Sequence, residues 1–414
     1  MAGPRLATMA WRNLWRNRRR TVITLVSIAF GAMLAVIFTG LGDASYAQMI
    51  DHAARMSGGH VVVQDREYAD APAAKRSLEG AGALRGAALG EADVVRAVPR
   101  VTAALMLSTS TTSTGVAAIG IDPALEDRAT LGLVEALAEG AFFAAPDERG
   151  IILGATLAEN LGVTLGKKVV YTTTDKRGEI ASGLARVTGI IRTGAASMDA
   201  GICLLPIDAL RQVLGYAPDE VTQLAVFVDG YRQAPAVAAR LGARAGADAA
   251  ALTWDRSQPE LAAFIGMKTG GMLVFEAIMT VLIAAGIFNT LFVSVMERLR
   301  EFGIMAAIGF SGAQLFGLIL WESVWLAICG LVAGVALVAG PYHHLSTVGV
   351  DTSKMIAPGV EVAGVTLDPI LRVEIYPPHA VAIAAAIFLT TLLAGLYPAW
   401  RASRVVPVET IRIV

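Results

Sequence analysis

The residues whose types and spacing best suit a specific interaction lie in one short segment, Met296–Gly309, with the sequence MERLREFGIMAAIG. Its apolar side chains recur three residues apart, a spacing typical of an amphipathic helix. The apolar positions are Leu299, Phe302, Met305 and Ile308, and the charged ones are Glu297, Arg298, Arg300 and Glu301. Such a helix between two apolar runs would suit the docking of a soluble partner. The alternative is an ordinary solvated loop between two membrane helices.

Motifs for catalysis or cofactor binding are weak. Residues 162–168 (GVTLGKK) resemble a phosphate-binding loop, but only three residues separate the glycines, and Lys168 stands where Ser or Thr is required. His343 and His344 are adjacent, so their side chains point apart, and no further ligand is spaced nearby. No serine lies in a G-x-S-x-G context. We therefore expect a non-catalytic chain with no cofactor or metal of its own.

Two carboxylates, Glu276 and Glu322, fall within or at the edge of apolar runs. An ionisable group in hydrocarbon is costly and is therefore a functional candidate. Glu276 is about one turn from the end of its run and could reach water at the headgroups. Glu322 is deeper, between Trp321 and Trp325. A structural polar contact is favoured over a proton relay at Glu322, because no second acid forms a chain with it.

The composition is that of a membrane protein. The chain has 414 residues, of which 55% are hydrophobic and 17% charged, with a mean hydropathy of +0.58. The apolar excess is concentrated in four blocks, each about the 20 residues that a spanning helix needs. A net charge of −1 argues against nucleic acid as a partner. Cys203 and Cys329 form neither a disulfide framework nor a metal motif.

Charge and hydropathy predict the order of segments along the chain. Arginines flank the first and last apolar blocks, which places both termini in the cytoplasm by the positive-inside rule. A cleaved signal peptide is the alternative for the first block, but its apolar run exceeds the usual 7–15 residues. The predicted segments are 1–20, a cytoplasmic interfacial amphipathic helix; 21–42, the first span; 43–270, a domain on the outer side of the membrane; 271–295, the second span; 296–313, the cytoplasmic loop with the amphipathic helix; 314–340, the third span; 341–378, a second outer loop; 379–399, the fourth span; and 400–414, a cytoplasmic tail.

The predicted fold class is an integral membrane, α-helical protein with four transmembrane helices and a large α+β domain, on the outer side of the membrane, inserted between transmembrane helices 1 and 2. Trp11, Trp15 and Arg16 would form an interfacial elbow against anionic headgroups. Gly330 and Gly334 have a spacing that permits close helix approach. In the domain, β-branched runs predict strands at 60–64, 117–121, 168–173, 185–191 and 224–228, with helices at 156–161 and 206–214.

Longer motifs resemble one family. ERLREFGIMAAIGFSGAQLFGLILWES and the closing LYPAWRASRVVPVETIR resemble the permease domain of the lipoprotein-releasing permeases, the MacB exporters and FtsX. GATLAENLGVTLGKKV and IIRTGAASMDAGICLLPIDALRQVLG, together with AIGIDP, are similar to stretches of that family's outer domain. Lys167 stands where the family usually has Asp, whereas Asp199 and Leu210 are in register.

The resemblance implies a permease subunit of a mechanotransmission-type ABC transporter in the bacterial inner membrane, so that 43–270 would be a large α+β periplasmic domain and 341–378 a periplasmic loop. A cytoplasmic dimer of ABC ATPase subunits would bind ATP and Mg, and a second permease chain, identical or homologous, would complete the transporter. The substrate would be a lipoprotein or another amphiphile, passed to a periplasmic acceptor or adaptor. An alternative is an FtsX-like signal transmitter that activates a periplasmic envelope enzyme and moves no cargo. By the resemblance, the coupling helix would comprise Glu297, Arg298, Leu299, Arg300, Glu301, Phe302, Gly303, Met305, Ile308 and Gly309.

Overall fold

The computed structural model describes residues 3–56, 58–146, 148–246, 248–353, 361–362, 365–366 and 370–405. The chain divides into two compact units. The helical unit comprises Met1–Ser45, Met267–Asp351 and Ile370–Val414, and the sheet unit comprises Tyr46–Gly266 and Thr352–Pro369. The division falls inside two long helices, and each unit is described by itself.

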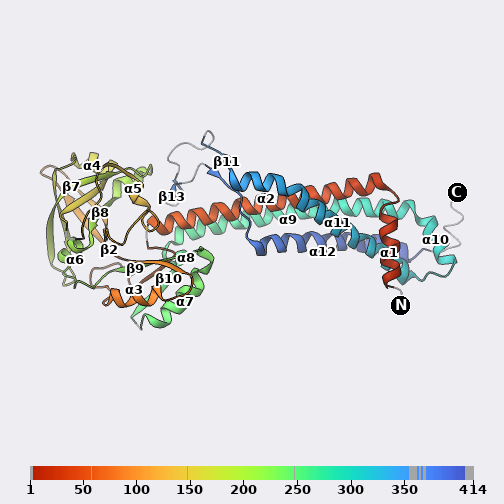
Figure 1. The fold of residues 1–414 in the computed structure, drawn as a ribbon, viewed down its shortest axis with the longest axis horizontal. Helices are drawn as coiled ribbons and strands as arrows, with labels where there is room; N and C mark the ends of the chain where they lie inside the picture. Colours follow the sequence, from red (N-terminus) through yellow and green to blue (C-terminus); the bar gives the residue numbers. More distant parts are fainter. Residues whose placement is uncertain are drawn as a thin grey trace. The chain divides into compact units, whose positions relative to one another are not determined.

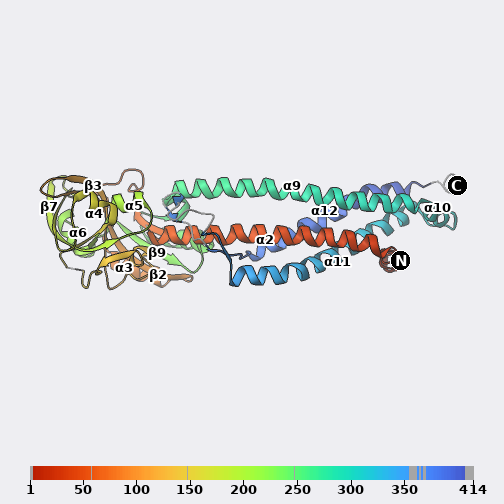
Figure 2. The same cartoon turned by 90° about the horizontal axis from the view of Figure 1, so that it is seen from above.

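Long apolar helices build the helical unit, where they run side by side (Figures 1 and 2). Four described helices, α2, α9, α11 and α12, are long and apolar enough to cross a membrane. The 39 residues of α2 make a helix about 58 Å long, against a hydrocarbon thickness of about 30 Å. The helices are α1 (Gly3–Leu14), α2 (Arg18–Met56), α9 (Pro259–Glu297), α10 (Leu299–Ala307), α11 (Gly312–Thr347) and α12 (Pro377–Ser403), with a two-residue strand pair β11 (Val350–Asp351) and β14 (Ile370–Leu371).

The interfacial segment is not one helix through residue 20, as the sequence suggested. Helix α1 ends at Leu14, and residues 15–17 form a turn before α2 begins. The Arg16 amide donates to the Asn13 carbonyl at 3.1 Å, which closes a turn instead of continuing the helix. The Thr21 hydroxyl donates to the carbonyl of Leu14, one of the acceptors left unpaired where α1 ends. The chain can therefore change direction between α1 and α2.

Two glycines of α11 allow it to approach α2 closely. A Cβ at Gly330 would lie 2.6 Å from Ile28 Cγ2, and a Cβ at Gly334 would lie 2.9 Å from Ala32 Cβ. Both glycines are buried. The spacing noted in the sequence therefore marks a helix–helix contact in which any side chain would clash.

The sheet unit combines a mixed ten-stranded sheet with short helices. The strands are β1 (Val61–Asp65), β2 (Val94–Ser108), β3 (Ser113–Ile121), β4 (Leu137–Gly140), β5 (Gly150–Gly154), β6 (Lys168–Thr174), β7 (Ile180–Ile191), β8 (Ile202–Pro206), β9 (Gln223–Val228) and β10 (Ala249–Thr253). The helices are α3 (Ala81–Leu89), α4 (Ala155–Leu161), α5 (Ala196–Gly201), α6 (Ile207–Leu214), α7 (Ala234–Arg244) and α8 (Trp254–Ser257). The five predicted strands and two predicted helices are confirmed as β1, β3, β6, β7, β9, α4 and α6.

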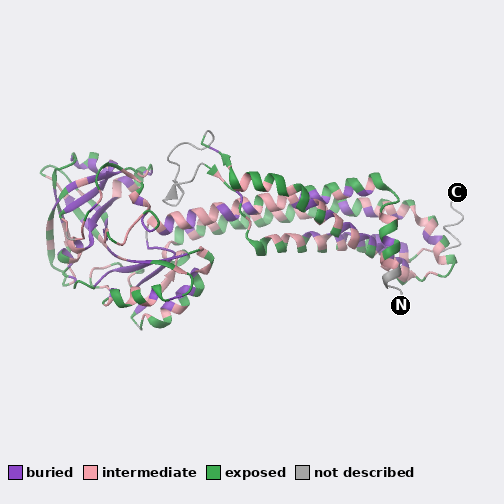
Figure 3. Ribbon diagram, in the orientation of Figure 1, coloured by how far each residue is buried: buried purple, intermediate pink, exposed green. Residues whose placement is uncertain are grey.

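The order of the strands closes part of the sheet on itself. Along the sheet the order is β10-β1-β9-β2-β3-β8-β5-β7-β4, and β6 pairs with both β2 and β7. Strands β2, β3, β8, β5, β7 and β6 therefore form a ring. Every residue of β5, β8 and β9 is buried, as Figure 3 shows for the interior of the sheet unit. This interior is the core of the unit.

Buried charge in the sheet unit is paired. The side chains of Arg100 and Glu126 are 0% and 1% exposed, and Arg100 Nε lies 2.7 Å from Glu126 Oε1. The guanidinium also donates to the Thr130 carbonyl at 2.7 Å. The pair keeps both charges solvated by protein groups where water is excluded.

His60 is a buried base in the same unit. Val228 N–H donates to its Nδ1 at 3.4 Å, so Nε2 carries the proton and faces Asp51 Oδ1 at 3.4 Å. Burial, followed by the charge of Arg55, lowers the pKa of His60 from 6.5 to about 4. The proximity of Asp51 does not reverse this, because Asp51 is already paired with Arg55. His60 is therefore neutral in the folded protein at neutral pH.

The histidine predicts a loss of stability on acidification. Below about pH 6.5 the imidazole of His60 is protonated in the unfolded chain but stays neutral in the folded protein. The free energy of unfolding should therefore fall by about 2 kcal/mol between about pH 7 and pH 5. His60→Gln should remove this decrease in the free energy of unfolding. His52→Gln, at a partly exposed position of α2, is the control and should retain it. Thermal unfolding of the full chain in detergent at the two pH values measures it; an unchanged pH dependence in His60→Gln contradicts the assignment.

The glycine contact predicts the effect of a side chain in α11. Gly330→Val should destabilise the helical unit by about 1–3 kcal/mol or more, because its methyl groups would enter the space of Ile28. Gly340→Val is the matched control, since a Cβ at Gly340 meets nothing within 4 Å. Thermal unfolding midpoints in detergent compare the two variants. Equal midpoints would mean that α11 and α2 do not depend on this contact.

Candidate functional site

Helix α10 is bounded on both sides by local breaks in the chain. Arg298 leaves the helical region, with φ −106° and ψ 11°, and separates α9 from α10. At the other end Gly309 has φ +105°, a conformation that favours glycine. Ser311 then caps α11 in a reciprocal capping box with Gln314. The sequence therefore forms a separate short helix between two long ones.

One face of α10 is packed into the protein's own core. Phe302 is 0% exposed and Gly303 is buried. The residues around Phe302 come from α1, α9, α11 and α12, and they are Ala10, Val295, Leu315, Leu318, Ile319, Ala399 and Ala402. Leu299 and Met305 are partly buried against this cluster. The apolar stripe predicted from the sequence is thus mostly turned inward, and Phe302 is not available to a partner.

The opposite face of α10 is exposed. Ile304 is 49% and Ile308 is 73% exposed, and Arg300 and Ala307 are exposed beside them. Gly309 is exposed as well. We call Arg300, Ile304, Ala307 and Ile308 the outer face of α10. Arg300 and Ile308 were predicted from the sequence pattern, whereas Ile304 was missed because it lies outside the three-residue spacing.

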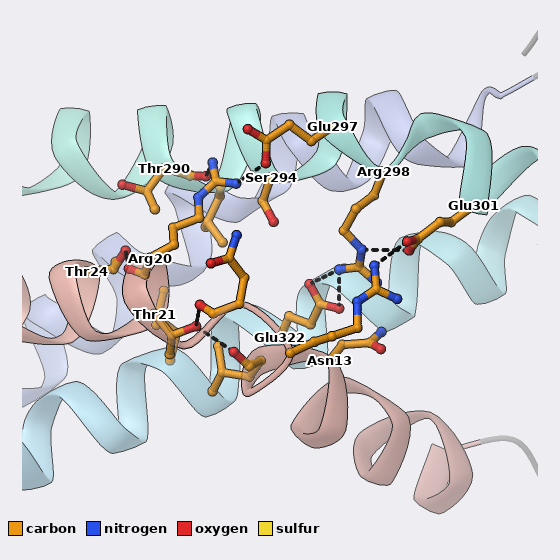
Figure 4. Close-up of a pocket in the computed structure, with 15 residues that line it drawn as sticks. Asn13, Arg20, Thr21, Thr24, Thr290, Ser294, Glu297, Arg298, Glu301 and Glu322 are labelled. Carbon is orange, nitrogen blue, oxygen red and sulfur yellow. Dashed lines mark hydrogen bonds and ion pairs between the residues drawn. The ribbon is translucent and has the colours of Figure 1, made fainter. Parts of the chain in front are cut away.

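The charged side chains of the segment form a network of ion pairs (Figure 4). Arg298 Nη1 lies 3.0 Å from Glu322 Oε1 on α11, and its Nε lies 3.1 Å from Glu301 Oε2. Glu301 also pairs with Arg16, in the turn between α1 and α2. Arg20 in the first turn of α2 lies 2.9 Å from Glu297. Arg298 thus supplies the cation for Glu322, the carboxylate that the sequence placed deep in an apolar run.

Burial differs between these ion pairs. The side chains of Arg298 and Glu322 are 14% and 8% exposed, whereas those of Arg16 and Glu301 are 56% and 40% exposed. Removing one partner of a buried pair leaves an uncompensated charge and costs about 3–5 kcal/mol, whereas an exposed pair contributes about 0–1 kcal/mol. The contact between Arg298 and Glu322 is therefore the strong one.

The network shifts the acid–base equilibria of its members. Burial raises the pKa of Glu301, but hydrogen bonds from Arg16 and Arg298 outweigh burial, so the net shift is downward. Burial lowers the pKa of Arg298, but Glu322 and Glu301 outweigh it, and the net shift is upward. Both residues are therefore charged at neutral pH.

A cavity of about 360 Å³ lies beside the network, lined by α2, α9, α11 and the turn after α1 (Figure 4). Polar side chains dominate its wall, with Leu291 and Leu326 among the few apolar ones. The polar lining residues are Asn13, Arg16, Asn17, Arg20, Thr21, Thr24, Thr290, Ser294, Glu297, Arg298, Glu301 and Glu322. The cavity therefore lies between α2 and α9 at the level of Arg20.

The predicted elbow residues gather near α11. The rings of Trp11 and Trp325 lie 5.1 Å apart between centroids, and Trp325 Nε1 donates to the Ala7 carbonyl at 3.0 Å. Trp15 lies 5.7 Å from Trp11. Both Trp11 and Trp15 remain more than a third exposed. This half-buried state suits aromatic side chains at a membrane surface.

The remaining intramembrane carboxylate, Glu276, is separate from the network. It accepts a hydrogen bond from the Thr39 hydroxyl of α2 at 2.6 Å, beside a contact between Phe38 and Phe275 at 5.3 Å.

Sequence reasoning missed another polar contact in the helical unit. Asp43 of α2 accepts the Tyr376 amide at 2.9 Å, and its Oδ2 lies 2.9 Å from His379 Nδ1 at the start of α12.

Comparisons with known proteins identify both halves of the chain. The family model described as the MacB-like periplasmic core domain matches residues 21–244, and the FtsX-like permease C-terminal model matches residues 273–407.

The curated relatives agree with the family models. The lipoprotein-releasing system transmembrane protein LolC of Neisseria meningitidis serogroup B is 26% identical over 422 residues, covering 96% of this chain and 95% of the relative. LolC of Xylella fastidiosa is 24% identical over the full length of both chains. The macrolide export ATP-binding/permease protein MacB of Nitrobacter winogradskyi is 24% identical, covering 98% of this chain but 60% of the relative. The chain therefore belongs to the FtsX/MacB/LolC family of ABC transporter permeases.

Proposed function

We propose that this chain is the permease subunit of a mechanotransmission-type ABC transporter that releases a lipoprotein or another amphiphile from the inner membrane. Hydrolysis of ATP by a separate ATPase dimer would move the large periplasmic domain through the membrane helices. The ATP and Mg would be bound by the ATPase subunits, and this chain would bind no cofactor of its own. A second permease chain, identical or homologous, would complete the transporter.

The observation that carries the proposal is the construction of α10. Its inner face is fixed by Phe302, at 0% exposure, while Ile304 and Ile308 are left uncovered. Two exposed isoleucines on a helix anchored by its other face form a surface suited to a soluble partner. Force on this surface would act on α9 and α11, because both continue directly from α10. The ATPase would dock on the outer face of α10.

The proposal fixes the orientation of the chain. Arg16, Arg20 and Arg298 gather at the α10 end of the helical unit, and the positive-inside rule places such an end in the cytoplasm. Both termini would then be cytoplasmic and the sheet unit periplasmic. Trp11 and Trp15 would lie at the cytoplasmic headgroups.

The lipoprotein substrate is favoured by the extent of the match to LolC. The two LolC relatives named above are covered to 95% and 100% of their length, whereas the MacB relative is covered to 60%. A periplasmic acceptor or adaptor would receive the substrate. An FtsX-like transmitter, which would activate a periplasmic envelope enzyme without moving cargo, is the alternative that the FtsX-like match over residues 273–407 keeps open.

The docking surface predicts which substitutions separate the ATPase from the permease. Ile304→Asp and Ile308→Asp should each abolish co-purification of the ATPase, because a charge would enter an apolar contact. Ile180→Asp, at an isoleucine of β7 that is 82% exposed, is the matched control and should leave the ATPase bound. Phe302→Asp is unsuitable for this purpose, because it would disrupt the core. Retention of the ATPase by both Ile304→Asp and Ile308→Asp would refute docking at this surface.

Purification of the chain from membranes, with its partners identified by mass spectrometry, separates the two functions. We expect an ATPase, a homologous or identical permease chain and a lipoprotein or another amphiphile. An ATPase accompanied by a periplasmic hydrolase or its activator, without an amphiphile, would instead support the signalling alternative. Absence of any ATPase from the wild-type preparation would refute both.

A further inference from the structure

The ion-pair network joins α10 and the end of α9 to the base of α2, a segment to which the backbone does not connect them. Helix α10 is linked through Arg298 to α9 and through residues 308–311 to α11. The base of α2 is remote in sequence, since Arg16 and Glu301 are 285 residues apart and Arg20 and Glu297 are 277 apart. These pairs bring together the two segments that a coupled motion would have to link.

The cavity lies where the ion pairs Arg20–Glu297 and Arg16–Glu301 form, so these pairs connect segments that do not pack closely there. At this level α2 and α9 face one another across a space of about 360 Å³, with Thr21 and Thr24 on one wall and Thr290 and Ser294 on another. Short hydroxyl side chains do not fill such a space. The longer Arg20 side chain reaches across it to Glu297 and to the carbonyl of Thr290 (Figure 4). Here side-chain ion pairs take the place of apolar helix packing.

The ion pair with α11 and the ion pairs with the base of α2 also differ in how readily they separate. Arg298 and Glu322 are both buried, so the contact with α11 is costly to separate. In the pairs with the α2 base, Glu301 is 40% and Glu297 is 60% exposed. Water can replace a partner at exposed carboxylates, so these pairs can break and re-form. The junction of α9 and α10 is thus held firmly to α11 through Arg298, whereas Glu301 of α10 and Glu297 at the end of α9 are held reversibly to the base of α2.

We propose that Glu297, the last residue of α9, and Glu301 of α10 are positioning residues that engage the base of α2. They do so through Arg20 in the first turn of α2 and Arg16 in the turn before it, so that α2 follows a displacement of α10 and the end of α9. The inference rests on the proposed function, because it assigns a path for the motion that the ATPase would impose. It adds to that function a second route beside the backbone connections to α9 and α11. Without these pairs the α10 end would act on α2 only through packing farther along the helix, where Ile28 and Ala32 contact α11.

The experiment uses the complex of the full chain with its ATPase in lipid nanodiscs. Hydrogen exchange of residues 40–56, the end of α2 farthest from Arg20, is measured without nucleotide and with ATP and vanadate. Arg16→Gln/Arg20→Gln removes both pairs. Arg12→Gln/Arg19→Gln is the matched control, because it removes the same charge from exposed residues of the same segment that form no ion pair with a described residue.

We expect the wild type and the Arg12→Gln/Arg19→Gln control to show a nucleotide-dependent change in exchange at residues 40–56. The Arg16→Gln/Arg20→Gln variant should retain the ATPase and basal hydrolysis but lose that change. Wild-type behaviour in Arg16→Gln/Arg20→Gln, or an equal loss in the control, would overturn the inference. Failure of the wild-type chain to retain any ATPase would instead overturn the proposed function.

Charge reversal keeps the test decisive if the double neutralisation does not fold. Glu297→Arg would set two cations against one another and should lose the nucleotide-dependent change. Arg20→Glu combined with Glu297→Arg restores an opposite pair and should recover it. A double variant no better than Glu297→Arg alone would show that the charge pair is not what links α2 to the end of α9.

Discussion

A carboxylate on a membrane-length helix requires a cation, and this requirement shapes the α10 end of the helical unit. Glu322 lies on α11 with 8% of its side chain exposed, and Arg298 meets it at 3.0 Å. Arg298 is also the residue at which α9 stops and the chain leaves helical geometry. The charge pair and the helix break therefore coincide. Together they set the direction of α10, which turns Phe302 inward and leaves Ile304 and Ile308 uncovered.

The sheet unit obeys the same rule in a different setting. Arg100 and Glu126 are almost completely buried and pair with one another, whereas His60 has no free carboxylate and is neutral instead. The chain thus uses both solutions available to a buried ionisable group, which are pairing and neutralisation. In the helical unit pairing predominates, and the shared carboxylate of Glu301 extends it to a third segment.

The sequence could predict elements whose pattern is local. The apolar blocks correspond to α2, α9, α11 and α12, and β-branched runs marked β1, β6 and β9. Strand β2 was missed, because Pro99 and several alanines interrupt its pattern. Strands β5 and β8 are short continuous apolar runs, and periodicity alone does not distinguish a buried strand from a helix in such runs.

The candidate site was predictable in composition but not in arrangement. The spacing of Phe302 and Met305 correctly placed them on one face of a helix, yet it could not say whether protein or solvent covers that face. The partner of Glu322 lies 24 residues away, and one of the two partners of Glu301, Arg16, lies 285 residues away. Such pairs depend on tertiary geometry. Gly330 and Gly334 were visible as a spacing, but their contacts, Ile28 and Ala32, were not.

The closed ring of strands in the sheet unit limits how that unit can recognise other proteins. Each of the strands β2, β3, β8, β5, β7 and β6 has neighbours on both sides over part of its length, so none offers a whole open edge. Among the described strands of this sheet, the edges are β4 and β10. Strand β4 has four residues and an irregular register, so it is poorly suited to pairing with an additional strand. Within the ten-stranded sheet, β10 is therefore the strand best suited to the addition of an extended peptide, and recognition at the ring is left to loops and side-chain surfaces.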